Sequence, residues 1–194
     1  MTGMCAILIS SCLAVLSGYT SADMEFHRIK VLSNGVPVSE DVLYDKDNKV
    51  AILNVNGEQD GNKSICQSSN FHDLERHILA LKQVKSGKCY LVTTEETLSD
   101  IERLFENGKV HETKLLSYIA RKDSVPVEDV EVQAGKKIAE FCKDYDTRWL
   151  VEAPVGRLRR RDLNLQRMPE PCLFNCGHCM FDITELSKSV EVME

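Results

Sequence analysis

Short, largely apolar runs bounded by turn residues recur through the first half of the chain. Residues 28–32 and 49–55 are two such runs, and turn residues such as Asn34-Gly35 and Asn56-Gly57 follow them. The pattern predicts two β-strands. Residues 77–84 (HILALKQV) and 88–93 (KCYLVT), joined by Ser86-Gly87, predict a β-hairpin. Residues 147–151 (TRWLV) predict a last strand.

Two later segments have the spacing of amphipathic helices. Thr93 and Glu96 form a capping box, and the apolar residues that follow recur every three to four positions up to Asn107-Gly108. Residues 134–145 predict a second helix. Residues 109–131 are charged, contain Pro126 and predict a mobile linker with little fixed structure. The order of strands, helix, loop, helix and strand predicts an α+β fold with an antiparallel sheet.

The N-terminus has the pattern of a secretory signal peptide. Residues 4–19 are uncharged and largely apolar, and the small residues Thr20-Ser21-Ala22 predict cleavage after Ala22. A buried helix and an uncleaved anchor are the alternatives, but the run is short for a membrane span, which needs about 20 apolar residues. We therefore expect a secreted, extracellular protein with no stable span once residues 1–22 are removed.

The amino-acid composition excludes several classes of function. The chain has 194 residues, of which 43% are hydrophobic, enough for a folded core. Its net charge of -6 argues against nucleic-acid binding, which requires a basic surface. We find no catalytic triad, acid dyad or phosphate-binding loop, and the five histidines show no metal-ligand spacing. The sequence thus predicts no catalytic residues, no cofactor and no metal site.

A basic run, residues 157–161, separates the preceding part of the chain from an acidic C-terminal tail. Arg157-Leu158-Arg159-Arg160-Arg161 fits the R-x-(K/R)-R pattern that furin-like convertases cleave, and a solvated charge cluster is the alternative. The tail, residues 162–194, has six acidic and two basic residues, a net charge of −4. This charge argues against a cationic membrane-lytic peptide.

Cysteines and a sequon also point to the secretory pathway. Asn62-Lys63-Ser64 is a glycosylation sequon at a turn. Two of the eight cysteines leave with the signal peptide, and the six that remain favour disulfides. The tail sequence Cys172-x3-Cys176-Gly177-His178-Cys179 allows a redox motif, a zinc site or structural disulfides. We favour disulfides, because no thioredoxin-like context surrounds the motif and four ligands within eight residues are cramped for zinc.

The middle of the chain resembles the BRICHOS domain family. The resemblance rests on Asp73-Leu74-Glu75-Arg76-His77-Ile78-Leu79-Ala80-Leu81-Lys82, on Gly87-Lys88-Cys89-Tyr90-Leu91-Val92 and on Ile138-Ala139-Glu140-Phe141-Cys142. It implies a small antiparallel sheet flanked by two helices, and a non-enzymatic chaperone of β-prone segments. The division that follows is a signal peptide (1–22), an N-terminal linker and strand region (23–69), a BRICHOS-like domain (70–152), a cleavage linker (153–161) and a cysteine-bearing C-terminal segment (162–194).

The resemblance also implies roles for single residues. Cys89 and Cys142 would form the family's disulfide, and Asp73 would be its aspartate, although Leu74 stands where the family usually has an aromatic residue. We expect Asp73 to be either a turn carboxylate or a pH-sensitive group that gates opening. If Cys89 pairs with Cys142, each pairing of the remaining four cysteines joins Cys66 to Cys172, Cys176 or Cys179.

The favoured function is therefore a secreted proprotein whose BRICHOS-like domain binds its own β-prone C-terminal segment or similar peptides. Residues 172–174 and 179–184 are apolar, aromatic and β-branched, as such a client would be. The alternative is a precursor of a host-defence or signalling peptide, and a thiol oxidoreductase is less favoured. A furin-like convertase is the expected processing partner, and homo-oligomerisation stays open.

Overall fold

A computed structural model describes residues 24–33, 35–60, 63–106, 110–153, 165–166 and 172–186. Three helices are present in this part of the chain: α1 (Leu98–Leu104), α2 (Val127–Ala134) and α3 (Lys136–Cys142). The strands are β1 (Glu25–Ser33), β2 (Val36–Asp45), β3 (Val50–Val55), β4 (Glu58–Asp60), β5 (Lys63–Ile65), β6 (Ser68–Asp73), β7 (Ile78–Gln83), β8 (Lys88–Thr93), β9 (His111–Glu112), β10 (Lys114–Ala120), β11 (Asp146–Glu152), β12 (Leu165–Gln166), β13 (Phe174–Cys176) and β14 (Cys179–Leu186).

One large sheet organises the molecule. Strands β1, β2, β3, β6, β7 and β8 are antiparallel neighbours in that order. The sheet continues from β8 to β11, β10, β14 and β12, with parallel pairing at β8–β11 and β10–β14. Strands β4 and β5 form a separate two-stranded hairpin. The sheet is therefore mixed rather than purely antiparallel.

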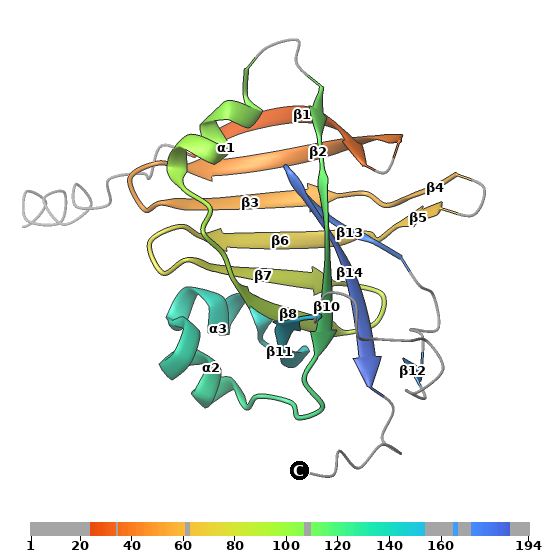
Figure 1. The fold of residues 1–194 in the computed structure, drawn as a ribbon. Coiled ribbons are helices and arrows are strands. Elements are labelled where there is room, and N and C mark those ends of the chain that lie inside the picture. Colours follow the sequence, from red (N-terminus) through yellow and green to blue (C-terminus); the bar gives the residue numbers. More distant parts are fainter. Residues whose placement is uncertain are drawn as a thin grey trace, which may run out of the picture.

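The sheet curls so that its later strands cover its earlier ones. Strand β9 pairs with β1 at one edge, while β10, two residues further along the chain, pairs with β11 and β14. The segment 111–120 thus passes from the β9 edge of the sheet to the opposite part of the strand order, where β10 lies between β11 and β14. Figure 1 shows β10 and β14 running together across the face formed by β1–β3 and β6–β8.

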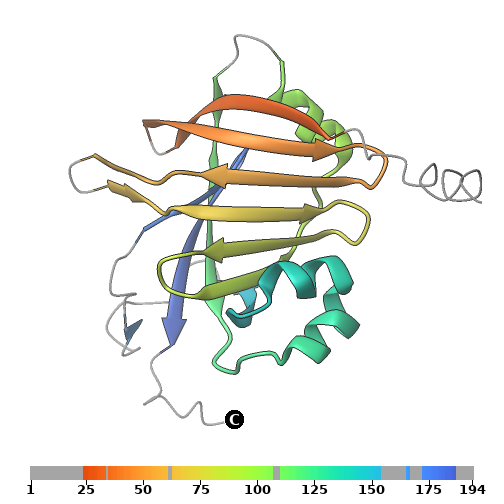
Figure 2. The same cartoon turned by 180° about the vertical axis from the view of Figure 1, so that it is seen from behind.

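Successive side chains of the central strands point to opposite faces of the sheet, so each face has its own hydrophobic core. We call the surface covered by β10, β13, β14 and α1 the front face, and the surface covered by α2 and α3 the back face (Figures 1 and 2). Leu79 and Leu81 of β7 belong to a front-face cluster, and their neighbours Ile78 and Ala80 pack with the helices behind. A strand buried on both faces reads as a nearly continuous apolar run, as residues 78–81 do.

The expected small antiparallel sheet with two flanking helices is wrong in size and pairing. The difference arises because 109–131 is not an unstructured linker: it contains β9, β10 and the start of α2. In β10 the inward residues are Leu116, Tyr118 and Ala120, but the outward residues Leu115 and Ile119 are also apolar, so the alternation is weak in the sequence. Strands β1–β3 and the tail strands β13 and β14 also lie in this sheet, together with β6–β8.

Two helix boundaries also differ from expectation. Thr93 is the last residue of β8, so the capping box is made instead by Thr97 and Asp100, whose Oδ2 accepts the Thr97 N–H at 2.8 Å. The predicted helix 134–145 is divided at Gly135, which has a φ of 90° and separates α2 from α3. None of the helices in the described ranges is long and apolar enough to cross a membrane.

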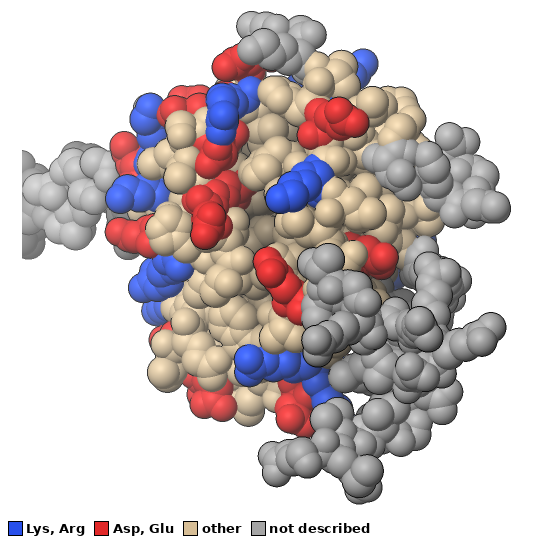
Figure 3. Space-filling model, viewed as in Figure 1, with Lys and Arg blue, Asp and Glu red and all other residues tan. Residues whose placement is uncertain are grey.

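Among the described residues visible in Figure 3, acidic and basic side chains are interspersed among uncharged ones, and neither sign dominates. Ion pairs such as Arg28–Asp41 (2.6 Å) and Lys46–Glu102 (2.7 Å) join side chains of opposite charge in the described chain. The described part of this surface therefore creates no strong field of one sign.

Candidate functional site

The most unusual feature of the fold is the C-terminal hairpin, which we define as residues 172–186. Strands β13 and β14 pair in register around a two-residue turn, with Cys176 opposite Cys179. Gly177 occupies the first turn position with a φ of 77°, which suits a tight hairpin turn of this length. The Cys-Gly-His-Cys sequence therefore forms a β-turn with a cysteine on each side.

Apolar side chains fix the C-terminal hairpin to the front face. Phe174 is fully buried (0% exposed) and makes an edge-on contact with Tyr90 of β8, with ring centroids 5.7 Å apart. Phe181 packs against Tyr118 of β10 with centroids 5.2 Å apart, and Met180 and Ile183 are also buried. Burial of aromatic and aliphatic side chains supplies most of the free energy that holds such a segment.

Backbone pairing holds the same segment along β10. Seven consecutive residue pairs join the two strands in parallel, from Lys114↔Cys179 to Ala120↔Glu185. At the far end the Glu185 carboxylate accepts a hydrogen bond from the Tyr90 hydroxyl at 2.7 Å and pairs with the Lys88 ammonium at 2.5 Å. The geometry is that of a strand added to a sheet, with main-chain bonds along its length and side-chain pockets on one side.

Buried polar groups lie beneath the turn of the C-terminal hairpin. The Gly177 N–H donates to Glu40 Oε2 at 3.0 Å, and Glu40 is completely buried in β2. Burial raises the pKa of Glu40 to about 8, although the hydrogen bond from Gly177 opposes the increase. The Asn70 amide donates to the Asn175 carbonyl at 2.5 Å. Polar contacts thus orient the turn in an otherwise apolar core.

A second buried group connects the turn to the segment before α1. One carboxylate oxygen of Glu96 is hydrogen-bonded to Nδ1 of His72. The other carboxylate oxygen lies 3.2 Å from Nδ1 of His178. His72 is fully buried, whereas the His178 side chain is 38% exposed. A carboxylate between two imidazoles can compensate positive charge on His178 in the turn.

The structure pairs four of the six cysteines outside the predicted signal peptide. Cys89 of β8 is bonded to Cys142 of α3, and Cys66 is bonded to Cys172 at a sequence separation of 106. Backbone hydrogen bonds flank the second bond, from Cys66 N–H to the Leu173 carbonyl at 2.8 Å and from Leu173 N–H to the Ser64 carbonyl at 2.9 Å. The hairpin is therefore attached covalently as well as by packing.

Cys176 and Cys179 are thiols, which differs from the disulfides expected throughout the tail. The pairing Cys66–Cys172 leaves them as neighbours across the turn, where the Cys176 thiol donates to the Cys179 carbonyl at 3.1 Å. Hydrogen bonding by Cys176 and His178, with the charge of His178, lowers the pKa of Cys179 despite burial. Burial raises the pKa of Cys176.

Asp73 lies at the end of β6, away from the hairpin turn. It is 1% exposed, and its Oδ1 accepts the Arg76 backbone N–H at 3.0 Å, as a turn carboxylate does. Its role in pH-dependent opening stays a prediction. Other residues singled out from the sequence lie outside the described residues: Ala22, Asn62, Arg157, Arg160 and Arg161.

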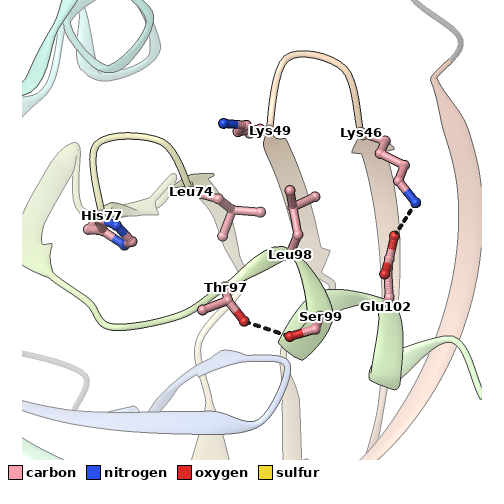
Figure 4. Close-up of a pocket in the computed structure, with 8 residues that line it drawn as sticks. All are labelled: Lys46, Lys49, Leu74, His77, Thr97, Leu98, Ser99 and Glu102. Atoms are coloured by element: carbon pink, nitrogen blue, oxygen red, sulfur yellow. Dashed lines mark hydrogen bonds and ion pairs between the residues drawn. The ribbon is translucent and has the colours of Figure 1, made fainter.

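A surface pocket of about 440 Å³ lies between the turns after β2 and β6 and the start of α1 (Figure 4). Figure 4 shows Lys46 paired with Glu102 across its mouth, so one of its cations is neutralised within the protein. Within the described residues, no group of three or more His, Cys, Asp and Glu side chains is arranged to hold a metal ion.

Glu40, His72 and Glu96 were missed in the sequence, although one signal for Glu40 is present. In β2 the inward positions alternate as Val36, Val38, Glu40, Val42 and Tyr44, so a carboxylate interrupts an apolar face. Such an interruption predicts a buried acid with a dedicated partner. His72 and Glu96 carry no comparable signal, because their contact depends on the path of the chain after β8.

Comparison with protein families identifies the centre of this fold. Residues 64–149 match the model of the BRICHOS domain. The chain contains a BRICHOS domain. Neither the curated proteins nor the solved structures give a match to it. The BRICHOS match covers Cys66, Asp73, Cys89 and Cys142, and it ends before the C-terminal hairpin. BRICHOS domains are a chaperone-like, non-catalytic family, and the C-terminal hairpin packs against this domain.

Proposed function

We propose that this chain is a secreted BRICHOS proprotein whose domain acts as an intramolecular chaperone for its own C-terminal hairpin. The observation that carries the proposal is the seven-residue parallel pairing of β14 with β10, which covers the front face. In this arrangement the chaperone and its client are parts of one chain.

The chemistry of the segment supports this role. Phe174, Met180, Phe181 and Ile183 are all buried in the folded chain. If exposed before folding, a short apolar and β-branched segment of this kind pairs edge to edge with other copies. Binding along β10 satisfies the backbone groups of β14 on that side and removes the ring of Phe181 from water. The domain therefore protects an aggregation-prone segment of its own chain.

Secretion and processing complete the proposal. The signal-like N-terminus would direct the chain to an oxidising compartment, where disulfides such as Cys66–Cys172 persist. A convertase that cuts after Arg160 or Arg161 would separate the domain from residues 162–194 in the backbone only. The tail would then stay attached through Cys172 until that bond is reduced.

The proposal is tested by loosening the hairpin on the intact chain. Tyr118→Ala removes the ring that packs on Phe181, whereas Leu115→Ala changes a 51%-exposed side chain on the same strand. We expect amide hydrogen exchange in β14 to speed up strongly in the first variant and little in the second. We also expect Tyr118→Ala to aggregate faster in thioflavin assays.

Equal aggregation of the Tyr118→Ala and Leu115→Ala variants, despite faster exchange in β14 of the former, would contradict the chaperone role. In that case the hairpin would be a structural part of the fold with no need of protection.

A further inference from the structure

We propose that Cys176 and Cys179 form a reversible thiol–disulfide site that exchanges with small-molecule or peptide disulfides, Cys179 being the attacking thiol. The site is the turn of the C-terminal hairpin, which lies outside the BRICHOS match. The proposal is independent of the chaperone role, since it concerns the chemistry of the turn and not the binding of β14.

The two sulfurs are positioned as an attacking and a resolving thiol. Cys176 and Cys179 are direct partners across a two-residue turn, so a bond between them requires no rearrangement of distant segments. Cys179 is partly exposed, whereas Cys176 is 1% exposed. An incoming disulfide therefore reaches Cys179 first, and Cys176 lies beside it for the second step.

The surroundings of the turn favour a thiolate at Cys179. His178, the adjacent residue, is held by the Glu96 carboxylate 3.2 Å from its Nδ1. Hydrogen bonds from Cys176 and His178 lower the pKa of the Cys179 thiol. Thiolates, not thiols, attack disulfides, and an adjacent imidazolium increases the thiolate fraction at neutral pH.

The exchange balances in two steps. The Cys179 thiolate attacks a disulfide RSSR, the S–S bond breaks, a mixed disulfide forms, and RS⁻ leaves and takes up a proton. Cys176 then gives up its proton and attacks the Cys179 sulfur, which releases a second RSH. The pair loses two electrons and two protons, and RSSR is reduced to two thiols. The reverse reaction opens the pair again.

The other two disulfides are expected not to take part. Cys66, Cys89 and Cys142 are each at most 3% exposed, and Cys172 is 9% exposed. A reagent in solution therefore has poor access to their sulfur atoms, and exchange depends on access. Selectivity for the Cys176–Cys179 pair follows from position in the fold.

The test equilibrates the full chain in glutathione buffers that range from reducing to oxidising, followed by acid quenching and disulfide mapping by mass spectrometry. We expect the Cys176–Cys179 pair to convert between dithiol and disulfide while the other two bonds stay closed. A pair that keeps one state in every buffer would overturn the proposal.

Matched variants assign the roles of the two thiols. With oxidised glutathione, Cys176→Ser is expected to accumulate a mixed disulfide on Cys179, and Cys179→Ser to react at least tenfold more slowly. The alkylation rate of Cys179 should rise with pH at a midpoint below about 8.5, the value of an ordinary thiol, and His178→Asn should move this midpoint upward. A glutathione adduct on Cys176 instead of Cys179, or a midpoint that His178→Asn leaves unchanged, would overturn the assignment.

Discussion

Gly177 is the residue at which the C-terminal hairpin approaches the core most closely. A Cβ atom there would lie 2.7 Å from Leu104 Cδ1 and 3.2 Å from Leu53 Cδ2. Its φ of 77° also disfavours any side chain. The hydrogen bond to Glu40 depends on this approach, since the Gly177 N–H is the donor.

Gly177→Ala is therefore expected to lower the free energy of unfolding by roughly 3 kcal/mol, from left-handed strain and overpacking together. Gly87→Ala is the control, because Gly87 has a φ of 66° but no atom within 4 Å of its Cβ position. It should cost roughly 1 kcal/mol, the strain alone. Urea unfolding of the two variants measures the difference. Equal losses would mean that the hairpin is not packed against Leu104 and Leu53 as described.

Glu40, which accepts the hydrogen bond from this turn, makes the free energy of unfolding depend on pH. The folded chain keeps a proton on Glu40 up to about pH 8, whereas an unperturbed glutamate releases it near 4.5. The folded state thus binds more protons between these values, so the free energy of unfolding falls as pH rises through this window. Below the window both states are protonated, and Glu40 contributes no pH dependence.

Glu40→Gln keeps an oxygen for the Gly177 N–H and removes the titration. We expect the variant to gain stability over the wild type at about pH 8 and not at about pH 5. Asp41→Asn is the control on the same strand, because Arg28 lowers the pKa of that partly exposed carboxyl and its titration lies below this range. Urea unfolding at both pH values measures the free energies of unfolding of the variants and the wild type. If Glu40→Gln changed the free energy of unfolding by the same amount at both pH values, Glu40 would not titrate between them.

At the scale of elements, the two disulfides attach material to opposite faces of the sheet. Cys89–Cys142 connects β8 to α3 on the back, and Cys66–Cys172 connects the segment after β5 to the hairpin on the front. Each should stabilise the chain by roughly 4 to 5 kcal/mol in the loop-entropy description. Their effects on local opening should nevertheless differ, because each bond restrains different elements.

Replacing both Cys89 and Cys142 with Ser is expected to speed amide hydrogen exchange in α2 and α3 more than in β13 and β14. Replacing both Cys66 and Cys172 with Ser should give the opposite pattern. The two variants are controls for each other, since they remove one bond each at similar expected cost. Uniform acceleration in both would indicate that the faces open together rather than separately.

The elements also show which features a single sequence predicts. The β7–β8 hairpin and β11 were expected from periodicity, because their apolar residues pack where the chain pattern places them. The parallel pairing of β11 with β8, and of β10 with β14, could not be predicted, since it joins segments that are distant in sequence. Strand β2 was missed because Ser39, Glu40 and Asp41 interrupt its apolar positions with three successive polar residues.

The candidate site was less predictable than the fold. Its cysteines were visible in the sequence, and the attachment of the tail through Cys66 followed by parity once the family resemblance implied the Cys89–Cys142 pair. The acids and histidine beneath the turn were not, because Glu40, His72 and Glu96 come from three separate segments that meet only under the hairpin. A buried carboxylate is identified by what lies opposite it, and this depends on the complete topology.

At the scale of the whole molecule, the hairpin is held in two independent ways. One is the Cys66–Cys172 bond, and the other is the pairing and packing of β14 on β10. A chain cleaved after Arg161 separates these contributions, because the described residues contain no other covalent link between the two pieces. The cleaved wild type is expected to run as one band on a non-reducing denaturing gel and as two bands after reduction.

The cleaved double variant Cys66→Ser/Cys172→Ser lacks the covalent link but keeps the strand pairing. It should give two bands without reductant, yet elute as a single species in native size-exclusion chromatography, since the buried faces of Phe174 and Phe181 still hold the tail. Adding Tyr118→Ala should release the tail under the same native conditions. Separation of the pieces without Tyr118→Ala would mean that the disulfide alone retains the hairpin, and that β10 does not bind it strongly enough to act as its chaperone.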